Sequence, residues 1–232
     1  MAGEATMRLY TGPLSMFGAK AEIALIEKGI GFERIAVPFG MQVLYTPKHA
    51  EVARINPKRQ VPVLVHGDLE LFDSTQIFEY IEDVRPDPPL WPRDIRQRAR
   101  ARQLELIADE VYFPHVIRLF GLQEAPEDAV TIAAKAAAAE VYGRMEAALA
   151  GRDFLAGAFG YADIALFMAQ LFGERMGVPL TDATPQLLAW RHRVGERPPV
   201  AQVAGEMGGY LIGEGRPVPA FLREIMERRA RG

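Results

Sequence analysis

The residues best suited to chemistry lie in two short segments, residues 60–64 (Gln-Val-Pro-Val-Leu) and Asp73-Ser74. A residue before proline is pushed into an extended conformation, so Val61 presents its backbone N–H and C=O like an open strand edge. Asp73-Ser74 precedes apolar residues with helical spacing, and the free N–H groups and dipole of a helix N-terminus favour an anion. Together the two segments predict a site for a small extended peptide that carries a carboxylate.

The sequence lacks the residues that several common catalytic centres require. It contains no cysteine, which excludes disulfides, zinc–thiolate sites and any mechanism with a protein thiol as the nucleophile. Its four histidines are scattered without zinc-motif spacing, so we expect no metal. Glycine-rich nucleotide-binding motifs and the G-x-S-x-G motif are also missing.

Composition and charge describe an ordinary globular protein of one or two domains. Of the 232 residues, 49% are hydrophobic and 25% charged, and the net charge of −3 gives no sign of nucleic-acid binding. No apolar run approaches the roughly 20 residues that a membrane-spanning helix needs. Residues 1–6 lack the pattern of a secretion signal. We therefore expect a cytoplasmic protein that binds neither nucleic acid nor membrane.

The first part of the chain alternates strand and helix patterns. An extended segment begins at residues 8–10, and Ser15 precedes a helical pattern that ends at Gly29. There follow a strand over 32–37, a short helix over 47–54, a hairpin over 61–66 and 69–72, and a helix over 74–84. The order β-α-β-α-β-β-α predicts a small mixed sheet with helices packed against it.

A proline-rich stretch separates this part from a helical one. Four prolines within residues 86–92 forbid a helix and stiffen the chain, as in a linker. Helical periodicity then predicts a long helix over 95–120 and further helices over 127–149, 161–176, 185–195, 201–207 and 222–229. The glycine-rich residues 205–215 predict a mobile flap. The predicted domains are residues 1–85 and 95–232, joined by a linker over 86–94.

Five segments, in their order and spacing, resemble the glutathione transferase family over nearly the whole chain. They are residues 9–15 (LYTGPLS), 24–29 (ALIEKG), 56–64 (NPKRQVPVL), 73–81 (DSTQIFEYI), and 154–157 (FLAG) with 162–166 (ADIAL). The resemblance implies a thioredoxin-like domain followed by an all-helical domain, in a serine-type member similar to theta, phi and beta classes and to bacterial members. One departure is Gly160, where the family usually has serine or threonine before the buried Asp163.

The resemblance also implies how glutathione, the co-substrate, is bound. The implied contacts are Lys48, Gln60, Val61, Asp73 and Ser74. A cis Pro62 turns the Val61 backbone outward, where the cysteinyl segment adds as a short strand. The γ-glutamyl ammonium suits Asp73, and its carboxylate suits the Ser74 hydroxyl and helix N–H groups. Gln60 and Lys48 would reach the glycyl carboxylate.

Ser15 is the catalytic residue that the resemblance implies. The thiolate of glutathione is the nucleophile, and a hydrogen bond near a helix N-terminus raises the thiolate fraction at neutral pH. Tyr10 is an alternative donor, but it lies in the predicted first strand, where we expect it in the core or the site lining. The second substrate would lie between the domains, against Met16, Phe17, Tyr112, Phe113 and His115.

These observations predict a cytoplasmic homodimer that activates bound glutathione for attack on a small hydrophobic electrophile, with detoxification as its general role. The same site suits glutathione-dependent ether cleavage, dehalogenation or isomerisation, among which the sequence does not choose. A non-catalytic binding or regulatory module of the same fold is a further alternative, disfavoured by the retention of Val61-Pro62 and Asp73-Ser74. A glutaredoxin-like thiol transferase is excluded because it needs a site cysteine.

Overall fold

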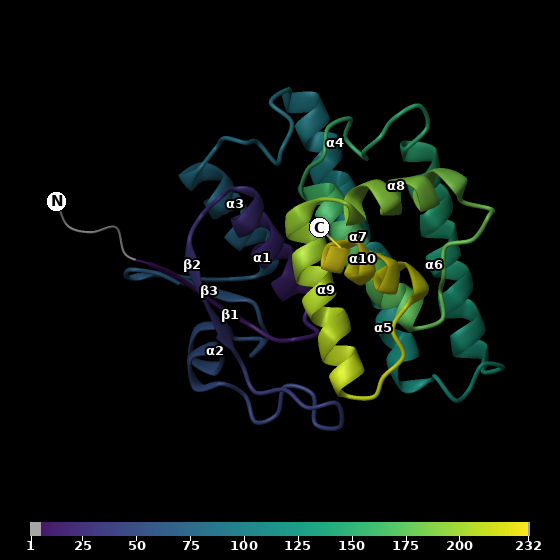
Figure 1. The fold of residues 1–232 in the computed structure, drawn as a ribbon, viewed down its shortest axis with the longest axis horizontal. Coiled ribbons are helices and arrows are strands. Elements are labelled where there is room, and N and C mark those ends of the chain that lie inside the picture. The colour runs from purple at the N-terminus through teal and green to yellow at the C-terminus, as the bar shows by residue number, and fades with distance from the viewer. Residues whose placement is uncertain (1–5, 232) are drawn as a thin grey trace. The chain divides into compact units, whose positions relative to one another are not determined.

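The computed structural model describes residues 6–231, and the chain divides into two compact units. The first unit comprises the residues up to Pro88 together with Gln202–Pro217, and the second comprises Pro89–Ala201 and the residues from Val218 onward. The boundary after Pro88 falls within the proline-rich stretch. Figure 1 traces the chain from its N-terminus (purple) to its C-terminus (yellow). Of residues 1–6, for which the sequence predicts no secretion signal, only Thr6 lies within the described residues.

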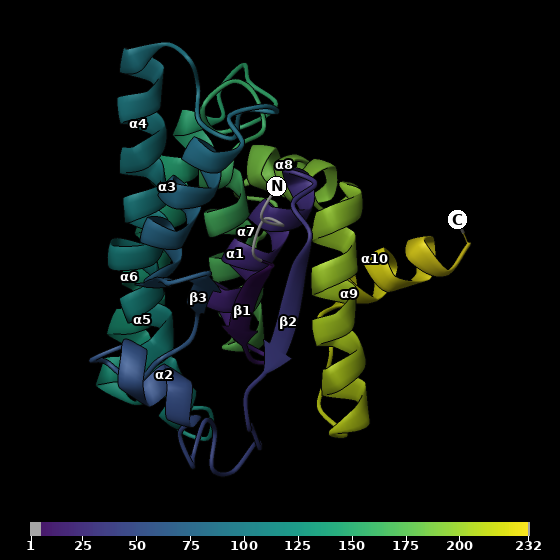
Figure 2. The ribbon, with the colours of Figure 1, turned by 90° about the vertical axis from the view of Figure 1, so that its left-hand side faces the viewer.

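A four-stranded mixed sheet forms the centre of the first unit. Its elements are β1 (Met7–Thr11), α1 (Met16–Glu27), β2 (Phe32–Ala36), α2 (Ala50–Ile55), β3 (Val63–His66), β4 (Leu69–Phe72) and α3 (Ser74–Val84). The strand order is β2-β1-β3-β4, with β1 parallel to β2 and the other neighbours antiparallel. Figure 2 labels the first three of these strands. This arrangement confirms the predicted element order and the thioredoxin-like class of the domain.

Alternating side chains give this sheet two buried faces. Leu9 of β1 pairs with Leu64 of β3, and both pack with Leu25 of α1. Val63, the neighbour of Leu64, packs with Val52 of α2. Because successive strand residues point to opposite faces, the apolar run in β3 fixes α1 and α3 on one face and α2 on the other.

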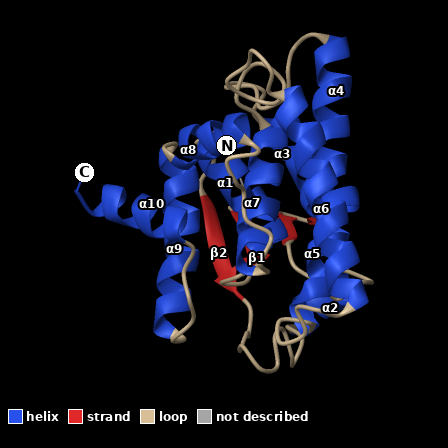
Figure 3. Cartoon of the chain, turned by 90° about the vertical axis from the view of Figure 1, so that its right-hand side faces the viewer, coloured by secondary structure: helices blue, strands red, loops and turns tan. Residues whose placement is uncertain are grey.

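The second unit is helical and has no strand among its described residues (Figure 3). Its elements are α4 (Ile95–Leu106), a π-helix (Ile107–Tyr112), α5 (Phe113–Arg118), a 3₁₀ turn (Leu119–Gly121), α6 (Ala129–Ala148), α7 (Tyr161–Arg175), α8 (Pro185–Gly195), the start of α9 (Pro198–Gly213) and α10 (Ala220–Arg231). The all-helical class predicted for this domain is confirmed. Within residues 6–231, none of the helices combines the length and apolar character that crossing a membrane requires.

The long helix predicted over residues 95–120 is present, but it is not a regular α-helix throughout. α4 ends at Leu106, a π-helical segment follows, and α5 begins at Phe113. Pro114 has no N–H to continue the ladder, and its ring would clash with the carbonyl four residues earlier. The wider π turn accommodates this interruption and leaves Tyr112 fully buried.

The prediction of a mobile flap over residues 205–215 is wrong, because α9 continues to Gly213. Val203, Met207 and Leu211 recur at helical spacing and are buried. This apolar stripe outweighs the cost of glycine in a helix, which is about 1 kcal/mol per residue.

Candidate functional site

One end of the sheet gathers the segments that the sequence singled out. β1 and β3 are antiparallel, and the C-terminal part of β1 pairs with Val63 at the start of β3. Val63 also lies opposite Phe72, the last residue of β4. Ser15, Val61 and Asp73 each lie within a few residues of these strand ends. The strand register therefore brings all three to one end of the sheet.

Ser15 is the N-cap residue of α1. Its side-chain oxygen accepts a hydrogen bond from the backbone N–H of Gly18 at 2.9 Å, and the residue is 8% exposed. The oxygen thus lies beside the free N–H groups at the positive end of the helix dipole. Because the bond from Gly18 uses the oxygen only as an acceptor, the hydroxyl hydrogen remains available as a donor.

Gly18 makes room for the hydroxyl groups around Ser15. A Cβ atom at this position would lie 2.0 Å from Oγ1 of Thr11 and 3.0 Å from Oγ of Ser15. Thr11 is fully buried, and its hydroxyl has no hydrogen-bond partner within residues 6–231. The sequence patterns predict no role for either Gly18 or Thr11, although Thr11 lies within the motif of residues 9–15. The available signal was a glycine in the first turn of a helix, where its propensity is poor.

The backbone of Val61 is unpaired at the start of β3. The Val61–Pro62 peptide bond is cis, as the family resemblance implied. No residue in the described part of the chain hydrogen-bonds the Val61 N–H or C=O, and strand pairing begins only at Val63. Such a backbone can pair with an extended peptide.

Asn56 fixes the loop that leads to Val61. This buried side chain donates from Nδ2 to the Gln60 carbonyl at 2.6 Å and accepts from the Lys58 N–H at 2.9 Å. The loop includes Arg59 at a positive φ of 53°. Gln60 itself is exposed, so its side chain is accessible to a ligand. Asn56 lies within the motif of residues 56–64, but the sequence pattern does not predict this supporting role.

Asp73 caps α3 from an unusual backbone conformation. Its Oδ1 accepts the N–H groups of Thr75 at 3.1 Å and Gln76 at 3.3 Å, and its φ is 75°. Asp73 is exposed, whereas Ser74, the first residue of α3, is 4% exposed. A positive φ in a residue other than glycine costs roughly 1–3 kcal/mol and is concentrated at functional sites.

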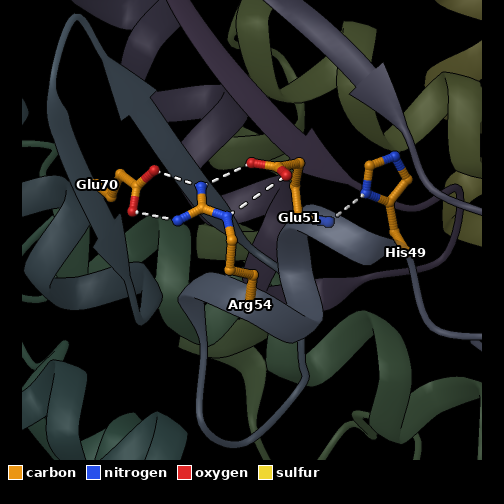
Figure 4. A network of polar contacts seen from close by, with 4 residues as sticks. All are labelled: His49, Glu51, Arg54 and Glu70. Atoms are coloured by element: carbon orange, nitrogen blue, oxygen red, sulfur yellow. Dashed lines mark hydrogen bonds and ion pairs between the residues drawn. The ribbon is translucent and has the colours of Figure 1, made fainter.

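A polar network ties α2 to β4 (Figure 4). Arg54 donates to Oε2 of Glu51 at 2.7 Å and to Oε2 of Glu70 at 2.9 Å, with a further contact to Oε1 of Glu70. These hydrogen bonds lower the pKa of Glu51 and of Glu70 and raise the pKa of Arg54. Nδ1 of His49 caps α2 by accepting the Glu51 N–H at 3.3 Å.

The same network positions the segment that carries Lys48. Lys48 is exposed and directly precedes His49, whose ring centroid lies 5.2 Å from that of Tyr10. Tyr10 is 4% exposed and packs in the core between the sheet and α2. This burial places Tyr10 among the core residues.

The residues expected to contact the second substrate fall in both units. In the first unit, Met16 is buried in the first turn of α1. Phe17 is half-buried, and the ammonium of Lys20 lies 5.6 Å from the centroid of its ring.

In the second unit, Tyr112 is fully buried and its hydroxyl hydrogen-bonds that of Tyr142. Burial raises the pKa of both hydroxyls. Phe113 is half-buried, with its ring 5.3 Å from that of Phe172, and His115 is half-buried on α5. Tyr112 therefore packs the helical core, whereas Phe113 and His115 are partly accessible.

Comparison with known proteins agrees with this geometry. Residues 9–89 match the model of the "Glutathione S-transferase, N-terminal domain" and residues 107–198 that of the "Glutathione S-transferase, C-terminal domain". The probable glutathione S-transferase parC of Nicotiana tabacum is 32% identical over 210 residues, which cover 87% of this chain and 90% of that protein.

Other relatives match over shorter lengths. Glutathione S-transferase 1 of Dianthus caryophyllus is 42% identical over 93 residues, which cover 40% of this chain and 41% of that protein. Glutathione S-transferase U7 of Arabidopsis thaliana is 31% identical over 152 residues, which cover 65% of this chain and 63% of that protein.

Solved structures share the fold. FzlA from C. crescentus has a TM-score of 0.75 at 25% identity and covers 86% of this chain and 92% of its own. Glutathione transferase F7 from Populus trichocarpa has a TM-score of 0.74 at 22% identity, and the match covers 87% of this chain and 99% of that chain. From both family-model matches and the near full-length relative, the chain belongs to the glutathione S-transferase family of enzymes.

Proposed function

We propose that the protein holds glutathione at the end of the sheet and activates its thiol for attack on an electrophile. The observation that carries the proposal is the strand register, which gathers Ser15, the unpaired Val61 backbone and Asp73 at one end. The Val61 backbone pairs with the cysteinyl segment, and Asp73 binds the γ-glutamyl ammonium. Ser74 and the α3 N-terminus take the adjacent carboxylate.

Two exposed side chains complete the proposed binding site. Gln60 offers an amide donor and Lys48 a positive charge to the glycyl carboxylate of glutathione. Asn56 does not contact the peptide in this proposal but holds the loop that presents Gln60 and Val61.

Ser15 is the proposed activating residue. The glutathione thiol releases its proton to solvent, and the Ser15 hydroxyl donates a hydrogen bond to the resulting thiolate. The N-terminal N–H groups of α1 stabilise the same negative charge. The sulfur then attacks the electrophilic carbon, a carbon–sulfur bond forms, and the leaving group departs with its electron pair. This role makes the protein a serine-type transferase, and Met16 and Phe17 are proposed contacts of the electrophile in the first unit.

Replacing Ser15 by alanine tests this role. The variant should bind glutathione within a few-fold of the parent affinity in calorimetry, because only a donor to the thiolate is lost. Turnover with a chloronitrobenzene electrophile should fall by roughly 10²–10³-fold, as for other single donors to a developing anion. The pKa of bound glutathione, followed by thiolate absorbance, should rise. Unchanged turnover and unchanged thiol pKa would contradict the role of Ser15.

We also propose that the protein is a homodimer. On α4, Ile95, Ala99, Arg102 and Leu106 share one face at helical spacing, and Ile95 and Leu106 are 77% and 53% exposed. The exposed apolar side chains of Ile95 and Leu106 on this face favour association with a second copy, and isologous dimers are the commonest soluble assemblies. Light scattering should give twice the chain mass, and Leu106→Glu should shift the protein to the monomer. A parent protein that stays monomeric at every concentration would contradict the dimer.

A further inference from the structure

A small cavity in the first unit lies beside Ser15. Its volume is about 170 Å³, and it is lined by α1, β2, α9 and the loop at Gly12-Pro13. All of the lining belongs to the first unit, because α9 is part of that unit from Gln202 onward. A cavity of this volume suits a small substituent of a substrate.

Two helix faces form the long walls of this cavity. On α1, Ser15, Ala19 and Glu22 are spaced i, i+4 and i+7 and share one face. At the rise of an α-helix, Ser15 and Glu22 lie roughly 10 Å apart along the axis. The facing residues of α9 are Val203, Glu206, Met207 and Tyr210. The small Ala19 leaves the space between the serine at one end and the carboxylate at the other.

The end of the cavity away from Ser15 is acidic. Glu22 is 4% exposed, and its Oε1 lies 2.9 Å from Nε of Arg34. Burial raises the pKa of Glu22, Arg34 lowers it, and the negative charge of Glu206 raises it further. Within the described residues, the Glu206 carboxylate accepts a hydrogen bond from the side-chain amide of Gln202 at 3.5 Å. Arg34 thus pairs with Glu22, and Glu206 adds a second carboxylate to the same lining, so the three groups carry a net negative charge when all of them are ionised.

The remaining wall adds an aromatic ring to this charge. The Tyr210 ring lies 5.8 Å from that of Phe39, with which it packs edge to face. Met207 is buried beside it and supplies a polarizable apolar surface. Aromatic rings next to carboxylates are a recurrent means of binding ammonium groups, because the ring face and the anions both attract a cation.

We propose that this cavity receives part of the second substrate and selects electrophiles that carry an ammonium group. Glu22 and Glu206 bind the cation, Met207 and Tyr210 contact the adjoining apolar part, and the reactive carbon lies toward Ser15. An anionic electrophile of the same size is repelled. The inference rests on the proposed transferase function and specifies the substrate class of that site.

The test uses three chloronitrobenzene electrophiles that differ in one ring substituent: aminomethyl (cation), hydroxymethyl (neutral) and carboxylate (anion). Their kcat/KM values with glutathione are each divided by the uncatalysed rate. In the parent protein the order should be cation, neutral, anion. Glu206→Gln should lower kcat/KM for the cation by roughly fivefold, the size that an accessible ion pair supports, and leave the neutral compound unchanged. The matched control is Glu33→Gln, an exposed carboxylate of β2 outside the cavity.

The outcomes are separable from failure of the transferase proposal itself. Conjugation of all three compounds without a charge preference, or an equal effect of Glu206→Gln on all three, would overturn the cation site while the transferase function stands. Tyr210→Leu provides a second variant and should also weaken the preference for the cation. A protein that binds no glutathione in calorimetry and conjugates none of the compounds would overturn both proposals.

Discussion

Two aspartates at helix N-termini show how differently the two units use the same side chain. Asp73 caps α3 in the first unit, is exposed, and has a φ of 75°. Asp163 lies in the first turn of α7 in the second unit and is fully buried. Oδ1 of Asp73 accepts only N–H groups of its own helix. Both oxygens of Asp163 accept N–H groups, from Leu155, Gly160 and Trp190.

The difference lies in the acceptor capacity that is left for a ligand. A carboxylate offers about four lone-pair sites. Oδ2 of Asp73 has no hydrogen bond to any residue in the described range, so a ligand ammonium can reach it. Asp163 is enclosed by protein donors. We therefore interpret Asp163 as a residue that specifies the fold and Asp73 as one that binds, with its strained backbone as supporting evidence.

Replacing Asp163 by alanine tests the folding side of this comparison and should have the largest effect. Three buried N–H groups lose their acceptor. Because each unsatisfied donor costs roughly 1–3 kcal/mol, the free energy of unfolding should fall by at least about 3 kcal/mol. Urea unfolding followed by tryptophan fluorescence measures it, since Trp91 and Trp190 both lie in the second unit. A variant as stable as the parent would show that Asp163 is dispensable.

The pH dependence of stability sharpens the same point. Burial raises the pKa of Asp163 from its ordinary 3.8 to about 6. The folded state therefore holds the proton more tightly than the unfolded state, so this contribution to stability is full below about pH 4 and is lost as the pH rises to about 6. The rise in the pKa of Asp163 corresponds to roughly 3 kcal/mol of stability at most. The stability difference between the parent and Asp163→Asn should therefore grow toward acid pH, and a flat difference would refute the assignment.

Asp73→Asn tests the binding side. Asparagine retains the helix cap and tolerates positive φ, so stability should change by less than about 0.5 kcal/mol. The charge that pairs with the γ-glutamyl ammonium is lost, which should weaken glutathione binding by roughly ten- to a hundredfold. Calorimetry with glutathione measures the affinity. Asp73→Ala should match that loss and also cost about 1 kcal/mol of stability through the missing cap. Equal affinity in Asp73→Asn and the parent would mean that Asp73 is only a cap.

Local patterns predicted most of the fold because local physics decides it. The helix over residues 74–84 was predicted with the bounds that the structure shows, since Asp73 is a strong cap before a regular apolar stripe. Where the sequence failed, long-range packing decided the outcome. The glycines of α9 predict a flap, but the buried side chains of Val203, Met207 and Leu211 make that segment a helix.

The site was predicted through motifs, but the residues that support it were not. Gly160 departs from the serine or threonine usual in the family, yet a Cβ there would lie 2.5 Å from the Leu90 carbonyl oxygen. The glycine is required by a chain segment about seventy residues away, which no local pattern reveals. Asn56 and Gly18 act in the same way, because their roles depend on contacts with Gln60 and Thr11 that appear only after folding.

Replacing Arg54 by glutamine should have the smallest effect and shows whether the binding side depends on indirect support. Arg54 contacts no proposed ligand group, but its ion pairs with Glu51 and Glu70 hold α2, which leads directly to Asn56 and the loop before Val61. Because these pairs are exposed, glutathione affinity should fall only roughly two- to threefold, and high salt should remove the difference from the parent.

The contribution of the Arg54 ion pairs to stability depends on pH in the direction opposite to that of Asp163. Arg54 lowers the pKa of both carboxylates, so its contribution is present above their ordinary pKa and is lost as the pH falls through the lowered values. Arg118→Gln, an exposed change of the same charge in the second unit, is the matched control for glutathione affinity. A loss in Arg54→Gln that persists in high salt would mean that Arg54 touches glutathione, which would extend the binding side of the comparison from Asp73 to α2.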